Sequence, residues 1–219
     1  MHPDSPRRRV VSLYQGAPAS VRAHVGVRWA TCPLPAVAAQ LPPVGRILDV
    51  GCGHGLLSLY LALTSPERRI TGIDVDRDKL HAARTAADGA GLVATFDEVA
   101  GAELPEGPWE GIAIVDVLYL LPADDQLALL RSCAGLLAPG GVLAVKEMAL
   151  VPRWKARWNA VQETTSVRIL GITQGEELTF LPPAEMAGAM SDGGLTVRDR
   201  PVHRGYPHPH HLLVGHRPG

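Results

Sequence analysis

The sequence predicts an α/β fold in which a doubly wound, mostly parallel sheet of seven strands ends in an antiparallel hairpin. Three observations indicate this fold. A short apolar strand, a glycine-rich turn and an apolar helix follow one another between residues 46 and 62. Short apolar runs then alternate with helical segments to about residue 148, which favours parallel strands joined by helices. Two further runs, 195–201 and 210–216, are joined by a turn rich in glycine and proline, which is typical of a hairpin.

Composition favours one soluble domain. The chain has 219 residues, of which 46% are hydrophobic, and its net charge of −1 argues against a nucleic-acid binder or a membrane-surface protein. The three cysteines are odd in number and lack metal-ligand spacing, so we expect reduced thiols in the cytoplasm. No apolar run is long enough to predict a membrane span or a signal peptide.

The first 45 residues form a leader that precedes the first strand. Its apolar positions recur at helical intervals between Tyr14 and Ala39 and are interrupted by prolines. In a doubly wound fold such a segment packs over the carboxyl ends of the strands, so we expect a helical lid. Tyr14 and Trp29 are candidates to face SAM or a substrate, although a surface or packing role is the more common one for such residues.

The stretch Arg46–Ala62 has the pattern of a ligand cradle. Ile47, Leu48 and Val50 predict a buried strand, and the apolar run from Leu56 predicts a helix. A strand, a glycine turn and a helix in this order bring bare backbone amides and a helix N-terminus close to a ligand. The glycines of the turn are Gly51, Gly53 and Gly55.

The spacing of this turn differs from that of a dinucleotide-binding motif. It is G-x-G-x-G rather than G-x-G-x-x-G, and Asp49 precedes it by two residues. Asp74 ends the next predicted strand, where a carboxylate can accept both hydroxyls of an adenosine ribose. Here the chain resembles the class I S-adenosylmethionine (SAM) dependent methyltransferases, which implies a Rossmann-like fold. The cofactor contacts that the resemblance implies are Asp49, near the methionine end of SAM, with Gly51, Cys52, Gly53, Gly55, Asp74 and Val75.

Three later segments extend the resemblance in the order and spacing of the family. They are ITGIDVDRDKLHAAR (70–84), GIAIVDVLYLLP (111–122) and LLAPGGVLAVKEM (136–148). With the glycine turn they cover about residues 40–148. The DVLYLL and LAPGGVLAVKE stretches are similar to those of small bacterial methyltransferases from lipid, polyketide and aryl polyene pathways.

The remaining elements follow from periodicity and from turn residues. Helices are expected from the N-cap Asp76 to about residue 89, over 123–137 and from Pro183 to Met190. Pro139-Gly140-Gly141 is expected to turn the chain into the fifth strand. The other strands are expected at 69–75, 93–96 and 111–115.

Acidic residues follow three of these strands. The resemblance implies that an acid just beyond the third strand contacts the adenine amino group, and Asp97 is the candidate. Asp116 ends the fourth strand, where a carboxylate can meet the positive sulfonium or amino group of SAM. Glu147 ends the fifth strand and is expected either to orient substrate or accept a proton, or to be a surface carboxylate paired with Lys146.

Residues 151–180 predict an insertion that walls the substrate pocket. Its basic and aromatic cluster includes Arg153, Trp154 and Arg157. Arginine forks bind carboxylate or phosphate, so this cluster is a candidate to grip an anionic or carrier-tethered acyl substrate. An amphipathic helix with buried tryptophans and solvated charges explains the same pattern.

Several histidines gather near the C-terminus. His210 and His211 alternate on a predicted strand and therefore face opposite sides, so we expect no metal site. Imidazole titrates near neutrality, which makes His208 and His210 candidate general bases, together with Glu147 and Tyr119.

The resemblance implies a methyltransferase that uses SAM and acts on a small molecule in biosynthesis. The expected acceptor is an aryl, polyketide-like or carrier-tethered acyl compound, and the enzyme is expected to be a monomer or homodimer without nucleic-acid partners. Two alternatives stay open at this point. One is an NAD-dependent oxidoreductase or epimerase, which the glycine spacing disfavours, and the other is a SAM-binding accessory protein without activity.

Overall fold

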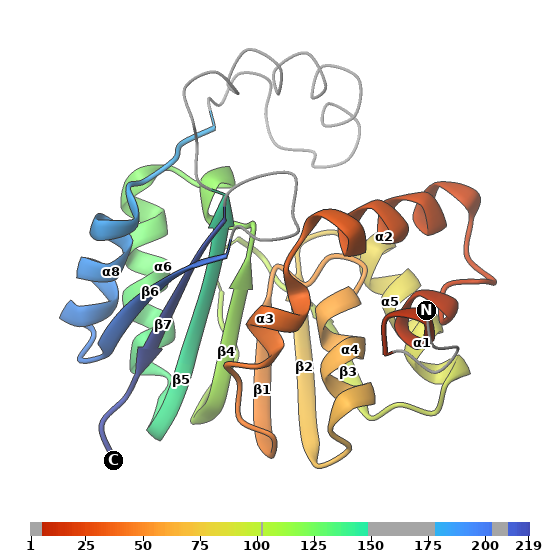
Figure 1. Cartoon of the computed structure of the whole chain (residues 1–219), viewed down its shortest axis with the longest axis horizontal. Coiled ribbons are helices and arrows are strands. Elements are labelled where there is room, and N and C mark those ends of the chain that lie inside the picture. Colours follow the sequence, from red (N-terminus) through yellow and green to blue (C-terminus); the bar gives the residue numbers. More distant parts are fainter. Residues whose placement is uncertain (1–5, 102, 149–177, 203–209) are drawn as a thin grey trace.

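The computed structural model describes residues 6–101, 103–148, 178–202 and 210–219. Within them, seven strands form one sheet in the order β3-β2-β1-β4-β5-β7-β6 (Figure 1). The first five strands pair in parallel, and β7 is antiparallel to both β5 and β6, which confirms the predicted fold. The strands are β1 (Gly45–Val50), β2 (Arg68–Asp74), β3 (Ala94–Glu98), β4 (Trp109–Val115), β5 (Leu137–Met148), β6 (Thr196–Val202) and β7 (His210–His216).

Helices cover both faces of the sheet because alternate strand residues are apolar on both sides. Ile47 of β1 packs in a core with residues from the leader, α4 and α5, whereas its neighbour Leu48 packs in a second core with α6 and α8. The helices are α1 (Pro6–Ser12), α2 (Ala19–Thr31), α3 (Leu34–Ala38), α4 (Leu56–Thr64), α5 (Arg77–Gly89), the 3₁₀ helix η1 (Leu118–Leu120), α6 (Ala123–Gly135) and α8 (Pro183–Asp192).

Two details of the strands differ from the prediction. The third strand extends to Glu98, so Asp97 lies inside it rather than beyond it. Strand β5 begins at Leu137, ahead of the predicted Pro139-Gly140-Gly141 turn. Trp109 pairs with Leu137 whereas Gly111 pairs with Val142, so residues 138–141 form a bulge within the strand. Helix α6 ends at Gly135 for the same reason.

Candidate functional site

The glycine turn between β1 and α4 is fixed against the end of β2. The backbone N–H groups of Gly51 and Cys52 both donate to the carbonyl oxygen of Ile73, at 2.8 and 3.0 Å. Gly55 immediately precedes α4, so the turn leads into a helix N-terminus. The turn therefore lies at the carboxyl edge of the sheet, which is where ligands bind in open α/β folds.

The three glycines of the turn have different neighbours. A β-carbon on Gly51 would collide with Val117, and one on Gly55 would lie 2.7 Å from Phe96 and 2.8 Å from Ala83. Among the described residues, a β-carbon on Gly53 would meet only the Lys79 side chain, at 3.9 Å. Gly51 and Gly55 thus permit close internal packing, whereas the open space lies beside Gly53.

Asp74 joins this turn to β2. Its Oδ2 accepts a hydrogen bond from the Gly53 N–H at 2.7 Å, and its Oδ1 accepts one from the Asp76 N–H at 2.9 Å. Each carboxylate oxygen has two acceptor sites, so both can also accept a ligand hydroxyl. Val75 follows directly and is 48% exposed, although it is apolar. The Asp74 carboxylate therefore lies beside Gly53, and Val75 follows it with an exposed aliphatic side chain.

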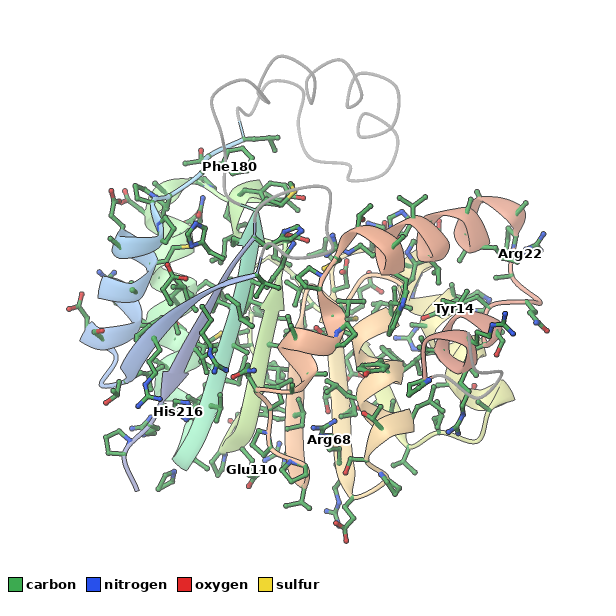
Figure 2. All side chains as sticks on the ribbon, viewed as in Figure 1. Tyr14, Arg22, Arg68, Glu110, Phe180 and His216 are labelled. Atoms are coloured by element: carbon green, nitrogen blue, oxygen red, sulfur yellow. The ribbon has the colours of Figure 1, made fainter. Side chains whose placement is uncertain are left out.

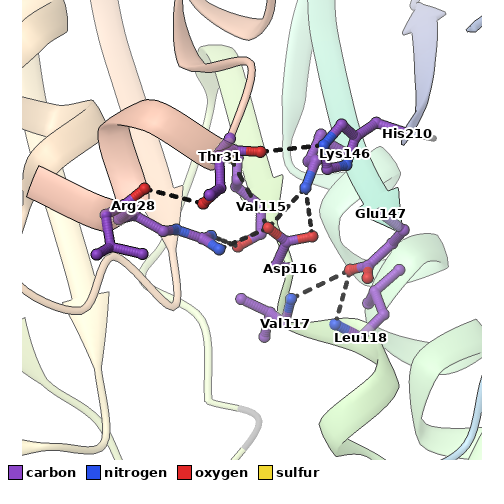
Figure 3. Close-up of polar contacts among 11 residues, drawn as sticks. Arg28, Thr31, Val115, Asp116, Val117, Leu118, Lys146, Glu147 and His210 are labelled. Atoms are coloured by element: carbon purple, nitrogen blue, oxygen red, sulfur yellow. Dashed lines mark hydrogen bonds and ion pairs between the residues drawn. The ribbon is translucent and has the colours of Figure 1, made fainter. Parts of the chain in front are cut away.

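A buried charge cluster lies at the ends of β4 and β5 (Figure 3). The ammonium of Lys146, a residue that is 0% exposed, contacts Asp116 Oδ1 and Oδ2 at 2.6 Å. The Arg28 guanidinium, from the leader, contacts Asp116 Oδ2 at 2.6 Å and donates to the Val115 carbonyl at 3.1 Å. Burial acts to raise the pKa of Asp116, but Arg28 and Lys146 hold it below its usual range. Asp116 is therefore an anion with two internal cations.

Glu147 lies on the opposite face of β5 from Lys146. It is buried, and its Oε1 accepts hydrogen bonds from the N–H groups of Val117 and Leu118, at 3.1 and 3.0 Å. Lys146 pairs with Asp116, so the alternative of an exposed Glu147–Lys146 ion pair was wrong. Alternation along the strand explains the difference, because adjacent residues point to opposite faces.

Comparison with known proteins places this arrangement in a family. The domain family described as a methyltransferase domain matches residues 47–141. The ubiquinone biosynthesis O-methyltransferase of Xanthomonas axonopodis pv. citri is 31% identical over 169 residues, which make up 74% of this chain and 68% of that relative. The chain belongs to the class I SAM-dependent methyltransferases.

Solved structures of low sequence identity show the same fold. Magnesium protoporphyrin IX methyltransferase from Synechocystis PCC 6803, solved with bound SAH, gives a TM-score of 0.66 at 19% identity and covers 96% of this chain and 93% of its own. An O-methyltransferase family protein from Burkholderia thailandensis gives a TM-score of 0.65 at 23% identity, over 85% of this chain and 55% of that one. The cofactor of the family is SAM, and the residues predicted to hold its ribose end, Gly53 and Asp74, lie together in the structure.

We expect cofactor binding by this methyltransferase to depend on pH through the ionisation of Asp49. The residue is buried, and its Oδ2 accepts a hydrogen bond from the Ser58 hydroxyl at 2.6 Å. Burial raises the pKa of Asp49 to about 6. If Asp49 holds the ammonium group of the methionine end, its ionised form binds, so affinity falls by up to about tenfold per pH unit below pH 6.

Calorimetric titration with SAH between pH 5 and 7.5 measures the slope of the logarithm of affinity against pH. The variant Asp49→Asn should show no such slope. His54 contributes no slope there, because burial lowers its pKa to about 4. An equal slope in wild type and Asp49→Asn contradicts the assignment.

The leader packs on the turn through residues that we predicted to face a substrate. Tyr14, which is labelled in Figure 2, is 1% exposed. Its hydroxyl donates to the His54 carbonyl at 2.6 Å. Trp29 is 7% exposed and packs edge-on against Tyr60, with ring centroids 5.1 Å apart. Both side chains are packed inside the protein in this structure, and their contact with a substrate stays a prediction. Tyr14 also supports the glycine turn.

The other predicted site residues are dispersed. Asp97 is exposed on β3, and Tyr119 stacks on Phe180 with ring centroids 5.2 Å apart. His210 is buried, with its Nε2 3.1 Å from the Thr31 carbonyl oxygen. Among the described residues no cluster of three metal-binding side chains occurs, and no described helix is long and apolar enough to span a membrane. The candidates His208, Arg153, Trp154 and Arg157 lie outside the described residues.

Sequence reasoning did not find the roles of Lys146 and Arg28. A lysine inside the apolar run LAVKE was the available signal, because a buried ammonium requires an anion. The partner could not be chosen from the sequence, since Arg28 and Asp116 are 88 residues apart along the chain.

Proposed function

We propose that this methyltransferase transfers the methyl group of SAM to an oxygen of a small biosynthetic acceptor, either an aromatic or polyketide-like compound or an acyl group on a carrier. One observation carries the proposal: the Gly53 amide and the Asp74 carboxylate meet at 2.7 Å beside open space, where a ribose hydroxyl can join them. The choice of an oxygen acceptor is supported by the relative's name, ubiquinone biosynthesis O-methyltransferase.

The residues of this chain have a limited chemical task. When bound, SAM supplies a methyl carbon that its positive sulfonium has already activated. The protein must hold the acceptor oxygen in line with that carbon and exclude water. Asp49 and Asp74, with the glycine turn between them, would fix the cofactor. The acceptor would then approach from the side of β4 and β5, beyond Asp116.

A phenolic acceptor must also lose a proton. Burial raises the pKa of Tyr119, so its hydroxyl keeps its proton at neutral pH and is a poor base. His210 Nε2 faces a carbonyl oxygen and so carries a hydrogen, which leaves Nδ1 as the basic atom of that ring. Among the described candidates, His210 is therefore better suited to accept the proton than Tyr119.

Asp74→Ala tests the cofactor half of the proposal. The variant should bind SAH more weakly by about 1–3 kcal/mol, because the ribose loses a charged acceptor. Calorimetry measures the change. Asp88→Ala, which removes an exposed carboxylate at the far end of α5, should bind SAH normally. Equal affinity of Asp74→Ala and wild type contradicts the assignment.

Transfer of a radiolabelled methyl group tests the acceptor half. A panel of catechols, polyketide-like phenols and acyl thioesters should include a substrate that is methylated on oxygen by wild type and more slowly by Asp74→Ala. Normal SAH binding without transfer to any member of the panel would support the alternative of a cofactor-binding protein without activity.

A further inference from the structure

A pocket of about 250 Å³ lies at the carboxyl end of β5. Phe180, one of its walls, lies at the same edge of the sheet as the ends of β4 and β5 (Figure 2). The volume exceeds the roughly 150 Å³ of a cavity that holds benzene. It therefore admits a substituted ring or a short acyl segment. Its described walls are the apolar residues Met148, Phe180, Leu181, Pro182, Pro183 and Met186, and the polar residues Glu147 and His211.

Glu147 is the buried acid of this pocket. The residue is 5% exposed, and Oε2 is buried with no hydrogen-bond partner in the described parts of the chain. Burial, and then the negative charge of Asp116, raises the pKa of Glu147 to about 8. The carboxyl group is therefore mainly neutral at pH 7.

The hydrogen bonds of Glu147 locate its proton. Oε1 already accepts from the N–H groups of Val117 and Leu118, so the proton belongs on Oε2. A carboxylic acid with its proton on Oε2 is a hydrogen-bond donor on the wall of an apolar pocket. This geometry favours a donor role for Glu147 over the predicted role of general base.

Four other titratable groups surround Glu147. Asp116, whose charge raises the pKa of Glu147, is paired with Lys146 on the far side of β5. His211 is the partner of Glu147 in the β5–β7 register, and its Nδ1 lies 3.0 Å from Asp199 Oδ2. Tyr119, in η1, keeps its proton because burial raises its pKa. The charge of Lys146 acts to lower the pKa of Glu147, but burial and the charge of Asp116 outweigh it.

The pocket adjoins the cofactor turn. Val117 donates its N–H to Glu147, and its side chain occupies the position where a β-carbon on Gly51 would fall. Tyr119 stacks on Phe180, with the ring planes 12° apart. The segment from Val117 to Tyr119 therefore contacts both the pocket and the turn. A molecule in the pocket is well placed to extend a reactive group towards the methyl donor.

We propose that this pocket binds a neutral aromatic or acyl portion of the methyl acceptor, with Glu147 Oε2 donating a hydrogen bond to a carbonyl oxygen. The inference rests on the proposed function, since it names the part of the acceptor that does not react. An anionic group fits poorly, because transfer of a charge into apolar walls is unfavourable without a paired cation.

Acetophenone and benzoate are probes of similar size that test this assignment. At pH 6.5, titrations followed by NMR should show acetophenone binding at least roughly fivefold more tightly than benzoate. At pH 9.5 Glu147 is ionised and no longer donates, so acetophenone should bind roughly fivefold more weakly than at pH 6.5. Glu147→Gln keeps an acceptor for Val117 and Leu118 and an N–H donor at the Oε2 position. This variant should bind acetophenone equally at both pH values.

Two further variants locate the probe. Met186→Phe fills the pocket and should abolish acetophenone binding, whereas Met190→Phe, one turn along α8 and equally buried, should keep it. The proposal is overturned if benzoate binds as tightly as acetophenone, if Glu147→Gln keeps the pH dependence, or if acetophenone binding is absent while SAH binding is normal. This last result would leave the proposed function intact. Failure to bind SAH would count against the proposed function alone.

Discussion

Gly53→Val should abolish SAM binding and leave the fold in place. The β-carbon of residue 53 would enter open space at the centre of the turn, where Lys79 is the only described side chain within 4 Å. Two further methyl groups would occupy the volume in which we place the cofactor, beside the Asp74 carboxylate. We expect at least a hundredfold loss of SAH affinity, which corresponds to about 2.7 kcal/mol, measured by calorimetry.

A matched variant separates this steric effect from backbone strain. Gly53 has a φ of 53°, where any β-branched residue is strained by roughly 1–2 kcal/mol. Gly91 has a φ of 61° and nothing within 4 Å of an added β-carbon, and it lies between α5 and β3. Gly91→Val should therefore lose similar stability in urea and bind SAH normally. Equal SAH affinity in the two variants would show that the cofactor does not lie against residue 53.

The fold was predictable because its signals are local. Buried parallel strands give short continuous apolar runs, and Ile47 and Leu48 show why: one packs on the α4 face and the other on the α6 face. The glycine spacing, with Asp49 before it and Asp74 after it, likewise lies within two neighbouring elements. The structure places all three at one edge of the sheet.

The buried charge cluster at the ends of β4 and β5 was less predictable, because it depends on contacts between segments that are distant in the sequence. Arg28 comes from the leader, Asp116 from the end of β4 and Lys146 from β5. Tyr14 and Trp29 are of residue types that often contact ligands, yet tertiary packing buries them. His211 was not singled out as a base, and it lines the pocket beside Glu147.

One signal in the sequence was available and was not used. Lys146 and Glu147 are adjacent on a strand, so they cannot face the same partner. That alternation alone excludes an ion pair between them within the sheet and requires two separate environments. The structure provides them: an ionised Asp116 for Lys146, and two backbone N–H groups for Glu147.

Asp116→Asn should destabilise the protein by about 3–5 kcal/mol, because it leaves the ammonium of Lys146 buried without an anion. Lys146 has no exposed surface, whereas the Arg28 side chain is 31% exposed and can be hydrated. Asparagine is the suitable replacement, since residue 116 has a φ of 55° and asparagine tolerates that conformation. Urea unfolding followed by circular dichroism measures the change in the free energy of unfolding.

Lys146→Met provides the control for this prediction. It removes the buried cation and leaves Asp116 with Arg28, so it should destabilise by less than Asp116→Asn. Adding Lys146→Met to Asp116→Asn should then restore stability, because no uncompensated ammonium remains. The difference between the double variant and the sum of the single variants gives the coupling energy of the pair. A loss below about 1 kcal/mol for Asp116→Asn would mean that water or another group already solvates Lys146.

The same variants decide whether Asp116 also contacts the cofactor, as the sequence predicts. Its two oxygens are already engaged by Arg28 and Lys146, so a direct contact with a sulfonium would compete with two cations. The double variant should have the stability of the wild type. We expect it to bind SAH with wild-type affinity, because SAH lacks the sulfonium charge. If SAM then binds more weakly than SAH by a larger factor than in wild type, the Asp116 charge acts on the sulfonium. An unchanged ratio of the two affinities assigns Asp116 to holding the leader on the sheet.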